Sequence, residues 1–532
     1  MRLATALAAL VVCAALAVPA RPQAQRSPFD LDEATIADLQ RRLSSGQDSA
    51  RSLVDKYLAR IGALDREGPA LRSVLEINPD AGAIADQRDA ERRAGRIRGP
   101  LHGIPVLLKD NIATADRMAT SAGSLALAGV PTPADAFLVA RLREAGAVIL
   151  GKTNLSEWAN FRSTHSSSGW SGRGGQTRNP YALDRNPSGS SSGSAVAVAA
   201  NLTAVAVGTE TDGSIVSPSN VSGVVGIKPT LGLVSRTGIV PIAHSQDTAG
   251  PIARSVADAA LLLGVMAGSD PADPATAPAD RRGQRDYTRF LDPNGLKGAR
   301  IGVVRNRLFG SSPATDRLAE AAVADMKALG AVIVDPVDIP TLGTFDDSEL
   351  DVLLYEFKAD LNRYLAALGP AAPVHSLKDV IAFDQAHAPE ELPLFGQELF
   401  VMAERKGPLT AMKYRRELAK NHRAARTLGI DAAMTKFHLD ALIAPTGGPA
   451  WLIDPVNGDG GTASNAAPST VAAVAGYPHI TVPMGQVRGL PVGISFVGRA
   501  WSEPTLLRLA YAYEQATRHR RPPTFAASAD LR

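Results

Sequence analysis

The chain has 532 residues, of which 20% are charged and 45% hydrophobic, and its formal net charge is only +3. This is the composition of an ordinary globular protein, and the length by itself suggests two or three domains. A charge of +3 on so long a chain excludes the strongly basic surface of nucleic-acid-binding proteins, so we expect no nucleic-acid partner.

The first predicted element is a secretion signal over residues 1–24. Arg2 supplies the positive start, residues 3–18 form an apolar stretch rich in Ala and Leu, and Pro19 ends it near small-residue cleavage sites. The alternative is an uncleaved membrane anchor, for which the apolar stretch is marginal in length. We expect cleavage, no membrane attachment afterwards, and a secreted or periplasmic protein.

Cysteine and histidine usage argues against a disulfide or a metal centre. Cys13 is the only cysteine of the chain, and it lies within the predicted signal. The nine histidines show no spacing that is typical of metal ligands. We therefore expect a mature protein with no thiol, no metal and no cofactor.

The elements after the signal alternate between helices and short strands. Apolar residues at helical spacing predict one helix from Ile36 to about Gly46 and a second helix after an N-cap at Ser49. The order strand, helix, strand follows at 106–108, 137–144 and 148–150, and again at 301–304, 318–329 and 332–334. We interpret Gly151 as the end of the strand at 148–150. Further strands are expected at 441–443, 480–482 and 492–497, before a helix capped by Ser502. This alternation predicts an α/β fold with a largely parallel sheet.

No linker divides this pattern convincingly into separate domains. The best boundary candidate is the stretch 268–286, rich in Ala, Asp and Pro, which we interpret as a surface connection. Residues 340–430 are helical in pattern and suit a cap near the functional site. We therefore predict a single domain over residues 25–532.

A glycine-containing loop carries the predicted nucleophile. Ser214 follows Asp212 and Gly213, and glycine lets the backbone bend so that successive N–H groups converge on one point. Amide hydrolysis needs a nucleophile and donors for the oxyanion. We predict Ser214 as the nucleophile and the N–H groups from Thr211 to Ser214 as the oxyanion hole.

The base for this nucleophile is predicted at Lys109, without any histidine. Lys109 ends an apolar strand, so its amine emerges at a sheet edge in dry surroundings, where desolvation lowers the pKa of a lysine. Ser190 precedes Ser214 in a loop of Gly and Ser and could relay a proton from Ser214 to a neutral Lys109. The order lysine, serine, serine thus predicts a Ser–Ser–Lys amide hydrolase.

These motifs resemble the amidase signature family. The resemblance rests on GIPVLLKD at 103–110, GKTN at 151–154, GQTRNP at 175–180, PSGSSSGS at 187–194, GTETDGS at 208–214, GIKPT at 226–230 and PVG at 491–493. It covers nearly the whole chain after the signal and implies an α/β fold with one large mixed β-sheet flanked by helices. It also implies Ser214 as the acyl-enzyme nucleophile, Ser190 after a cis peptide bond, and Lys109 as the base.

Within this family the chain is most similar to bacterial peptide amidases, which hydrolyse the C-terminal amide of peptides. The similarity rests on NLSEWANF at 154–161, GTETDGSIV at 208–216, FGQEL at 395–399 and AWSEP at 500–504. Two departures from common family patterns bear on the substrate, because Asp212 replaces a glycine and Val216 an arginine. The Asp212 carboxylate could accept a hydrogen bond from the substrate amide, and Val216 favours a neutral carboxamide over a carboxylate.

Other interpretations remain open at this point. GSSSG at 189–193 also fits the nucleophile elbow of the α/β-hydrolases, with Ser191 as nucleophile, although a polar loop at 178–187 precedes it instead of a strand. A broad-specificity aliphatic or aryl amidase is the main alternative within the family. An amidotransferase A-type subunit, which works with protein and transfer RNA partners, is disfavoured by the signal and by Val216. We expect a small-molecule or peptide amide substrate and no obligate protein partner.

Overall fold

The computed structural model describes residues 29–459 and 468–530, so the signal predicted over residues 1–24 lies outside the described residues. Contacts between Cα atoms divide the chain into a short unit, Met1–Asp32, and a large one, Glu33–Arg532. No unit boundary falls at 268–286. Among the described helices, none combines the length and the apolar character that crossing a membrane requires.

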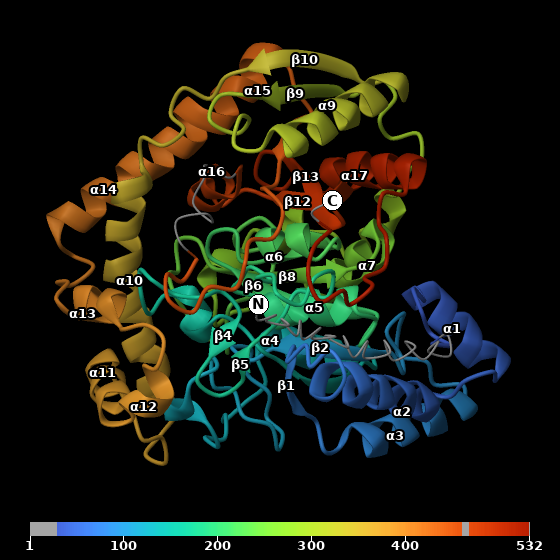
Figure 1. Ribbon diagram of the computed structural model, residues 1–532, viewed down its shortest axis with the longest axis vertical. Helices are drawn as coiled ribbons and strands as arrows, with labels where there is room; N and C mark the ends of the chain where they lie inside the picture. The colour runs from blue at the N-terminus through green and yellow to red at the C-terminus, as the bar shows by residue number, and fades with distance from the viewer. Residues whose placement is uncertain (1–28, 460–467, 531–532) are drawn as a thin grey trace, which may run out of the picture. The chain divides into compact units, whose positions relative to one another are not determined.

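An 11-stranded sheet forms the centre of the large unit (Figure 1). The pairs β2–β3, β2–β6, β9–β10 and β9–β11 are parallel, and the other pairs are antiparallel. The mixed sheet implied by the family resemblance is confirmed, and the largely parallel sheet inferred from the alternating pattern is wrong. The strand order is β1 (Val74–Ile77), β3 (Val148–Thr153), β2 (Pro105–Lys109), β6 (Val205–Glu210), β8 (Thr248–Ala253), β7 (Val225–Lys228), β12 (His479–Val487), β13 (Leu490–Val497), β11 (Ala441–Pro445), β9 (Arg300–Val304) and β10 (Val332–Val337).

Strands β12 and β13 show one reason why the sheet is mixed. Both are longer than predicted, and they pair antiparallel across a tight turn at Arg488 and Gly489. Both turn residues have positive φ, +52° and +77°, as such hairpin turns require. The sequence pattern predicted two short strands but did not predict that they form a hairpin.

Strand β3 is also longer than predicted, because Gly151 lies inside it and does not end it. Gly151 pairs with Ile77 of β1, and a Cβ at this position would collide with the carbonyl oxygen of Glu76. A glycine within a strand often marks such a close approach of another backbone. The strand therefore continues to Thr153.

The helices confirm most of the sequence predictions. Helix α1 ends at a left-handed Gly46, Ser49 caps α2, α4 has the predicted bounds, and residues 340–430 are helical as expected. Ser502 precedes α17, but its side chain donates to the Arg499 carbonyl and does not cap the helix. The helices are α1 (Ile36–Ser45), α2 (Ala50–Ile61), α3 (Ala81–Arg93), α4 (Phe137–Glu144), α5 (Ser192–Ala199), α6 (Val216–Val221), α7 (Val256–Met266), α8 (Ala279–Arg282), α9 (Pro313–Ala328), α10 (Asp346–Ala367), α11 (Leu377–Ala386), α12 (Ala388–Glu391), α13 (Glu398–Glu404), α14 (Met412–His422), α15 (Asp431–Phe437), α16 (Pro468–Ala475) and α17 (Glu503–Thr517).

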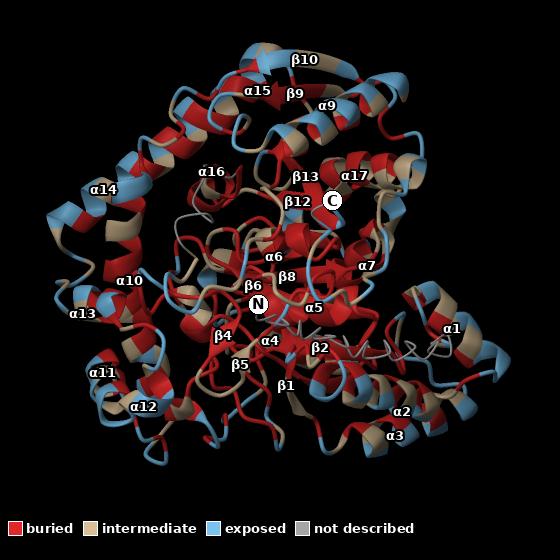
Figure 2. Ribbon diagram, in the orientation of Figure 1, coloured by how far each residue is buried: buried red, intermediate tan, exposed pale blue. Residues whose placement is uncertain are grey.

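Burial is concentrated around the strands that carry the predicted site. Figure 2 shows the central strands and α5 in the colour of buried residues, and exposed positions along α2, α3, α9 and α14. Every residue of β2, β3, β6 and α5 is buried, and α5 packs against these three strands. The small side chains of α5 allow this close approach, so the loops at its start and at the ends of β2 and β6 are held in one rigid region.

Candidate active site

Lys109 is the last residue of β2, an interior strand of the sheet, and its side chain is fully buried. Its amine lies 2.7 Å from Ser190 Oγ, 2.8 Å from Thr209 Oγ1, 3.1 Å from Ser191 Oγ and 3.2 Å from the Thr209 carbonyl. Desolvation holds the pKa of Lys109 well below its usual value, although the carboxylates of Glu210 and Asp247 oppose this shift. The structure therefore favours a neutral amine at this position.

A neutral Lys109 can direct its lone pair at Ser190, so that Nζ accepts from Ser190 Oγ across the 2.7 Å contact. Ser191 Oγ donates to the Thr209 carbonyl at 3.0 Å, so towards Lys109 it can only accept. A neutral amine has two N–H groups, and Ser191 Oγ and Thr209 Oγ1 can accept both of them. The lone pair then faces the hydroxyl of Ser190, which is the geometry that a base needs.

Ser190 lies in the loop between the polar segment 178–187 and α5. The peptide bond between Gly189 and Ser190 is cis, as the family resemblance implied. Ser190 is fully buried, and its carbonyl accepts from the N–H of Ser156 at 3.1 Å. These contacts hold the Ser190 hydroxyl against Lys109.

Ser214 lies in the loop between β6 and α6, beside the loop of Ser190. The N–H of Ser191 donates to the Ser214 carbonyl at 3.0 Å, which joins the two loops. Glu210 Oε2 accepts from the N–H groups of Ile215 and Val216 at 2.7 and 3.0 Å, so the residues after Ser214 are also fixed. The structure thus brings Lys109, Ser190 and the Ser214 loop into one buried region.

The predicted oxyanion residues turn around Gly213, which has φ +73°. Thr211 Oγ1 donates to Asp247 at 2.6 Å, and Asp212 Oδ2 accepts from Thr470 Oγ1 at 2.7 Å. Among hydrogen bonds between described residues, none uses the N–H groups from Asp212 to Ser214 as donors. Backbone donors left free in a fixed turn are what an oxyanion hole requires.

Comparison with known proteins identifies the family of this chain. A family model described as Amidase matches residues 52–507. The chain belongs to the amidase signature family. It is similar to a probable amidase of Arabidopsis thaliana, with 43% identity over 515 residues, or 94% of this chain and 93% of that protein. The mixed α/β fold and the predicted enzyme class, an amidase, are therefore confirmed.

Two further relatives bear on specificity. The native peptide amidase of Stenotrophomonas maltophilia is a solved structure with 57% identity and a TM-score of 0.89, and the match covers 94% of this chain and 100% of that chain. The A-type subunit of the glutamyl-tRNA(Gln) amidotransferase from a Synechococcus strain is 36% identical over 497 residues, covering 92% of this chain and 93% of that protein. Family membership alone therefore leaves the substrate open.

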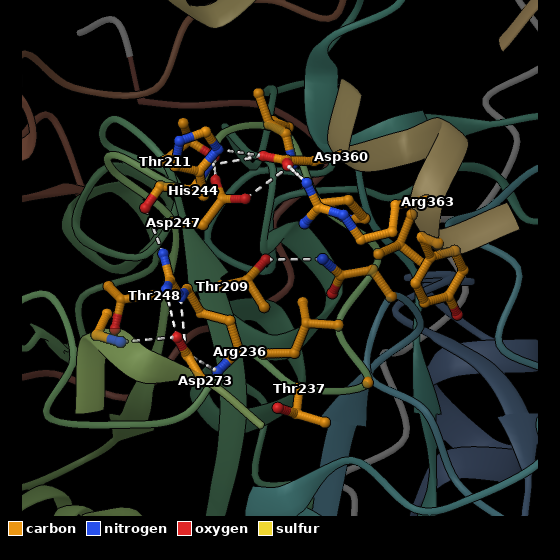
Figure 3. A pocket seen from close by; sticks show the side chains of 18 of the residues that line it. Thr209, Thr211, Arg236, Thr237, His244, Asp247, Thr248, Asp273, Asp360 and Arg363 are labelled. Atoms are coloured by element: carbon orange, nitrogen blue, oxygen red, sulfur yellow. Dashed lines mark hydrogen bonds and ion pairs between the residues drawn. The ribbon is translucent and has the colours of Figure 1, made fainter. Parts of the chain in front are cut away.

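A cavity of about 620 Å³ adjoins the candidate site of this amidase (Figure 3). Thr209 and Thr211 form part of its wall, and α10 contributes Asp360 and Arg363. Most of its lining is apolar, including Ala159, Ile239, Val240, Ile242, Tyr364, Ala367 and Leu409. Its size is typical of small-ligand sites, and the helical segment predicted as a cap does line it.

One group of side chains near this cavity has donor types that suit a metal ion. Atoms of His244, Glu356 and Asp360 all lie within 4.8 Å of one another. They are already paired, because His244 Nδ1 lies 2.7 Å from Asp360 Oδ2 and Tyr414 donates to Glu356 at 2.7 Å. Spacing along the sequence could not reveal this group, since a loop and two different helices bring it together with Tyr414.

The roles of several residues around Lys109 were not predicted from the sequence. Ser191 appeared only as an alternative nucleophile, whereas its hydroxyl is committed to Lys109 and Thr209. Thr209 and Glu210 lie within the motif at 208–214. Thr209 contacts Lys109, which is distant in sequence, whereas Glu210 accepts from the nearby N–H groups of Ile215 and Val216. Lys152 and Lys228, also in family motifs, are equally buried but donate to the carbonyls of residues 112 and 477. Contact with the serine loop distinguishes Lys109 from these two lysines.

Ser191→Ala should lower kcat by on the order of tenfold, because Lys109 loses one of the acceptors that hold its amine in place. The loss should be much smaller than that caused by Ser214→Ala, since no bond to Ser191 forms or breaks. Steady-state kinetics of the two variants, with melting temperatures as a folding control, test this. A larger effect at Ser191 would favour the nucleophile elbow.

Proposed function

We propose that this amidase hydrolyses the C-terminal amide of peptides to the free acid and ammonia. The observation that carries the chemistry is the 2.7 Å contact between Ser190 Oγ and the amine of the fully buried Lys109. Ser190 lies in the loop that is hydrogen-bonded to the Ser214 loop. The similarity to the Stenotrophomonas peptide amidase, 57% over nearly the whole chain, supports the peptide specificity.

In the proposed reaction, Ser214 attacks the carboxamide carbon while Ser190 takes its proton and passes its own to Lys109. The tetrahedral oxyanion is stabilised by the N–H groups of the Thr211–Ser214 loop. The proton then returns through Ser190 to the leaving nitrogen, the C–N bond breaks, and ammonia departs from an acyl-enzyme. Water attacks this ester with Lys109 again as base, and the acid is released.

The surroundings of the nucleophile suit a neutral carboxamide. Val216, two residues after Ser214, is buried, and its N–H is bound by Glu210. Asp212 Oδ1 has no hydrogen-bond partner among the described residues and could accept from the amide nitrogen. A substrate carboxylate would meet the Asp212 carboxylate, and Val216 stands where the common family pattern has an arginine, which disfavours acidic substrates.

We further infer that the protein acts without a cofactor, a nucleic acid or an obligate protein partner, outside the cytoplasm. The amidotransferase alternative needs cytosolic partners, and residues 1–24 resemble a cleaved signal instead. Fractionation of cells that express the full chain tests this location. Activity confined to the cytosol would contradict it.

Ammonia release tests the proposed specificity. The protein from residue 25 onward is given an N-blocked dipeptide amide, an aryl amide and glutamine. Release from the dipeptide amide alone, with internal peptide bonds intact, is the expected result. Release only from the aryl amide would be consistent with the serine chemistry but would contradict the peptide specificity and favour a broad-specificity amidase.

Activity should fall as pH decreases through the lowered pKa of Lys109. The reaction needs the neutral amine, and burial places its pKa well below that of a free lysine, so activity persists at pH values where a free lysine is charged. The profile of kcat/KM against pH should therefore rise to a plateau in the alkaline direction. A profile that stays flat into mildly acidic pH would argue against a lysine base.

A further inference from the structure

Asn111 presents an unused acceptor to the cavity beside Lys109. It lies two residues after Lys109, is only 2% exposed and forms part of the cavity wall. Its Nδ2 donates to Thr209 Oγ1 at 3.0 Å, while its Oδ1 has no hydrogen-bond partner among the described residues. Buried amide oxygens are nearly always hydrogen-bonded in native proteins, so an unpartnered one on a cavity wall is a place where a ligand can donate a hydrogen bond.

Several polar groups elsewhere on the wall are engaged with protein partners. Arg236 binds Asp273 through its Nε at 2.8 Å, and His244 binds Asp360 at 2.7 Å (Figure 3). Asp247 accepts from Thr211 and from two backbone N–H groups. Glu210 Oε1 and Tyr364 Oη also have no hydrogen-bond partner among the described residues. Asn111 Oδ1 is the uncharged amide oxygen among these acceptors, and it lies beside Thr209, which contacts Lys109, so it is placed to accept a hydrogen from a ligand there.

The position of Asn111 relates this acceptor to the scissile bond. Thr209 Oγ1 contacts both Lys109 and Asn111, and Thr209 and Thr211 are part of the same wall. The oxyanion loop continues from Thr211 to Ser214. A substrate that reaches Ser214 from this cavity would pass the wall formed by Thr211, Thr209 and Asn111.

We propose that Asn111 Oδ1 accepts a hydrogen bond from the backbone N–H of the substrate residue that carries the C-terminal amide. This inference rests on the proposed function and adds a specificity-determining residue to it. Simple alkyl and aryl amides lack this N–H, so they would leave Oδ1 unpaired. The apolar part of the cavity would then take the side chain of that residue.

The test compares two substrates that differ only at this N–H. One is an N-blocked dipeptide amide, and the other is its depsipeptide analogue, in which an ester oxygen replaces the peptide N–H. Ammonia release gives kcat/KM for each with the wild-type protein and with Asn111→Ala. The wild type should prefer the dipeptide amide by on the order of tenfold, as expected for one hydrogen bond to a buried acceptor.

Asn111→Ala should lower the activity on both substrates, because Thr209 loses a donor, and should remove the preference between them. Asn111→Asp keeps an oxygen in the same place and should keep the preference. Ser191→Ala is the matched control, since it perturbs Lys109 from another side and should lower both rates while their ratio stays that of the wild type.

Two results would overturn the inference in distinguishable ways. An unchanged preference in Asn111→Ala, with peptide amides still hydrolysed, would overturn the role of Asn111 and leave the proposed function intact. Ammonia release from an aryl amide but from neither peptide substrate would overturn the peptide specificity itself, and the role of Asn111 with it.

Discussion

Ser214→Ala should lower kcat by several hundred-fold or more, because the acyl-enzyme cannot form without the hydroxyl. The backbone donors of the oxyanion loop would remain, so the affinity for substrate should change little. The carbonyl of residue 214 also keeps its bond to the N–H of Ser191, and the fold should be unaffected. Steady-state ammonia release and the melting temperature measure the two effects separately.

Ser217→Ala is a matched control for this variant. It removes a hydroxyl from the same segment, three residues further along and within α6, where Ser217 Oγ lies 2.8 Å from Ser188 Oγ. We expect it to keep most of the activity. Equal losses at Ser214 and Ser217 would point to disturbed packing of the loops and would contradict a nucleophilic role for Ser214.

Lys109→Met and Ser190→Ala should each lower kcat by on the order of a hundred-fold or more. Methionine keeps much of the buried volume but removes the amine, and alanine at 190 removes the hydroxyl that contacts it at 2.7 Å. Each change interrupts the same proton path. The double variant should therefore be little worse than the more damaged single variant, because residues that act as one unit are not additive.

The same double-variant cycle separates a relay from independent contributions. If the losses at Lys109 and Ser190 multiply, the two residues act separately and the relay is wrong. Melting temperatures of all three variants must be compared, since Lys109 is fully buried among four polar contacts. A loss of kcat without a matching loss of stability is the expected result.

The sequence predicted the parts of the site that lie within short motifs. Lys109 at the end of an apolar strand and Ser190 in a glycine- and serine-rich loop were identified in this way, and the structure places their side chains in contact. The free N–H groups from Asp212 to Ser214 also follow from local features, because Gly213 permits the turn. A short motif is enough to predict a site residue when the features that identify it lie within that motif.

Contacts between distant segments could not be predicted in the same way. Gln246 Nε2 donates both to Glu349 at 2.8 Å and to the Thr211 carbonyl at 3.3 Å. The hydroxyl of Ser191 is occupied because Thr209, on a neighbouring strand, faces it. Such pairings depend on how the loops and α10 are arranged around the sheet.

The sheet shows the same division between local and distant information. Most strands were located, but their directions depend on connections that the pattern did not reveal, such as the hairpin of β12 and β13. Gly151 was interpreted as the end of a strand, whereas it marks the approach of the backbone at Glu76. A glycine identifies an unusual backbone position, and only the structure shows which neighbour requires it.

The most direct test of Ser214 as the nucleophile is to locate the acyl group during turnover. The protein from residue 25 onward is mixed with an N-blocked dipeptide amide and quenched in acid, and the covalent adduct is mapped by peptide mass spectrometry. We expect a mass increase equal to the acyl group on the peptide that contains Ser214, and no increase in Ser214→Ala. An acyl group on Ser190 or Ser191, or rapid ammonia release by Ser214→Ala, would contradict it.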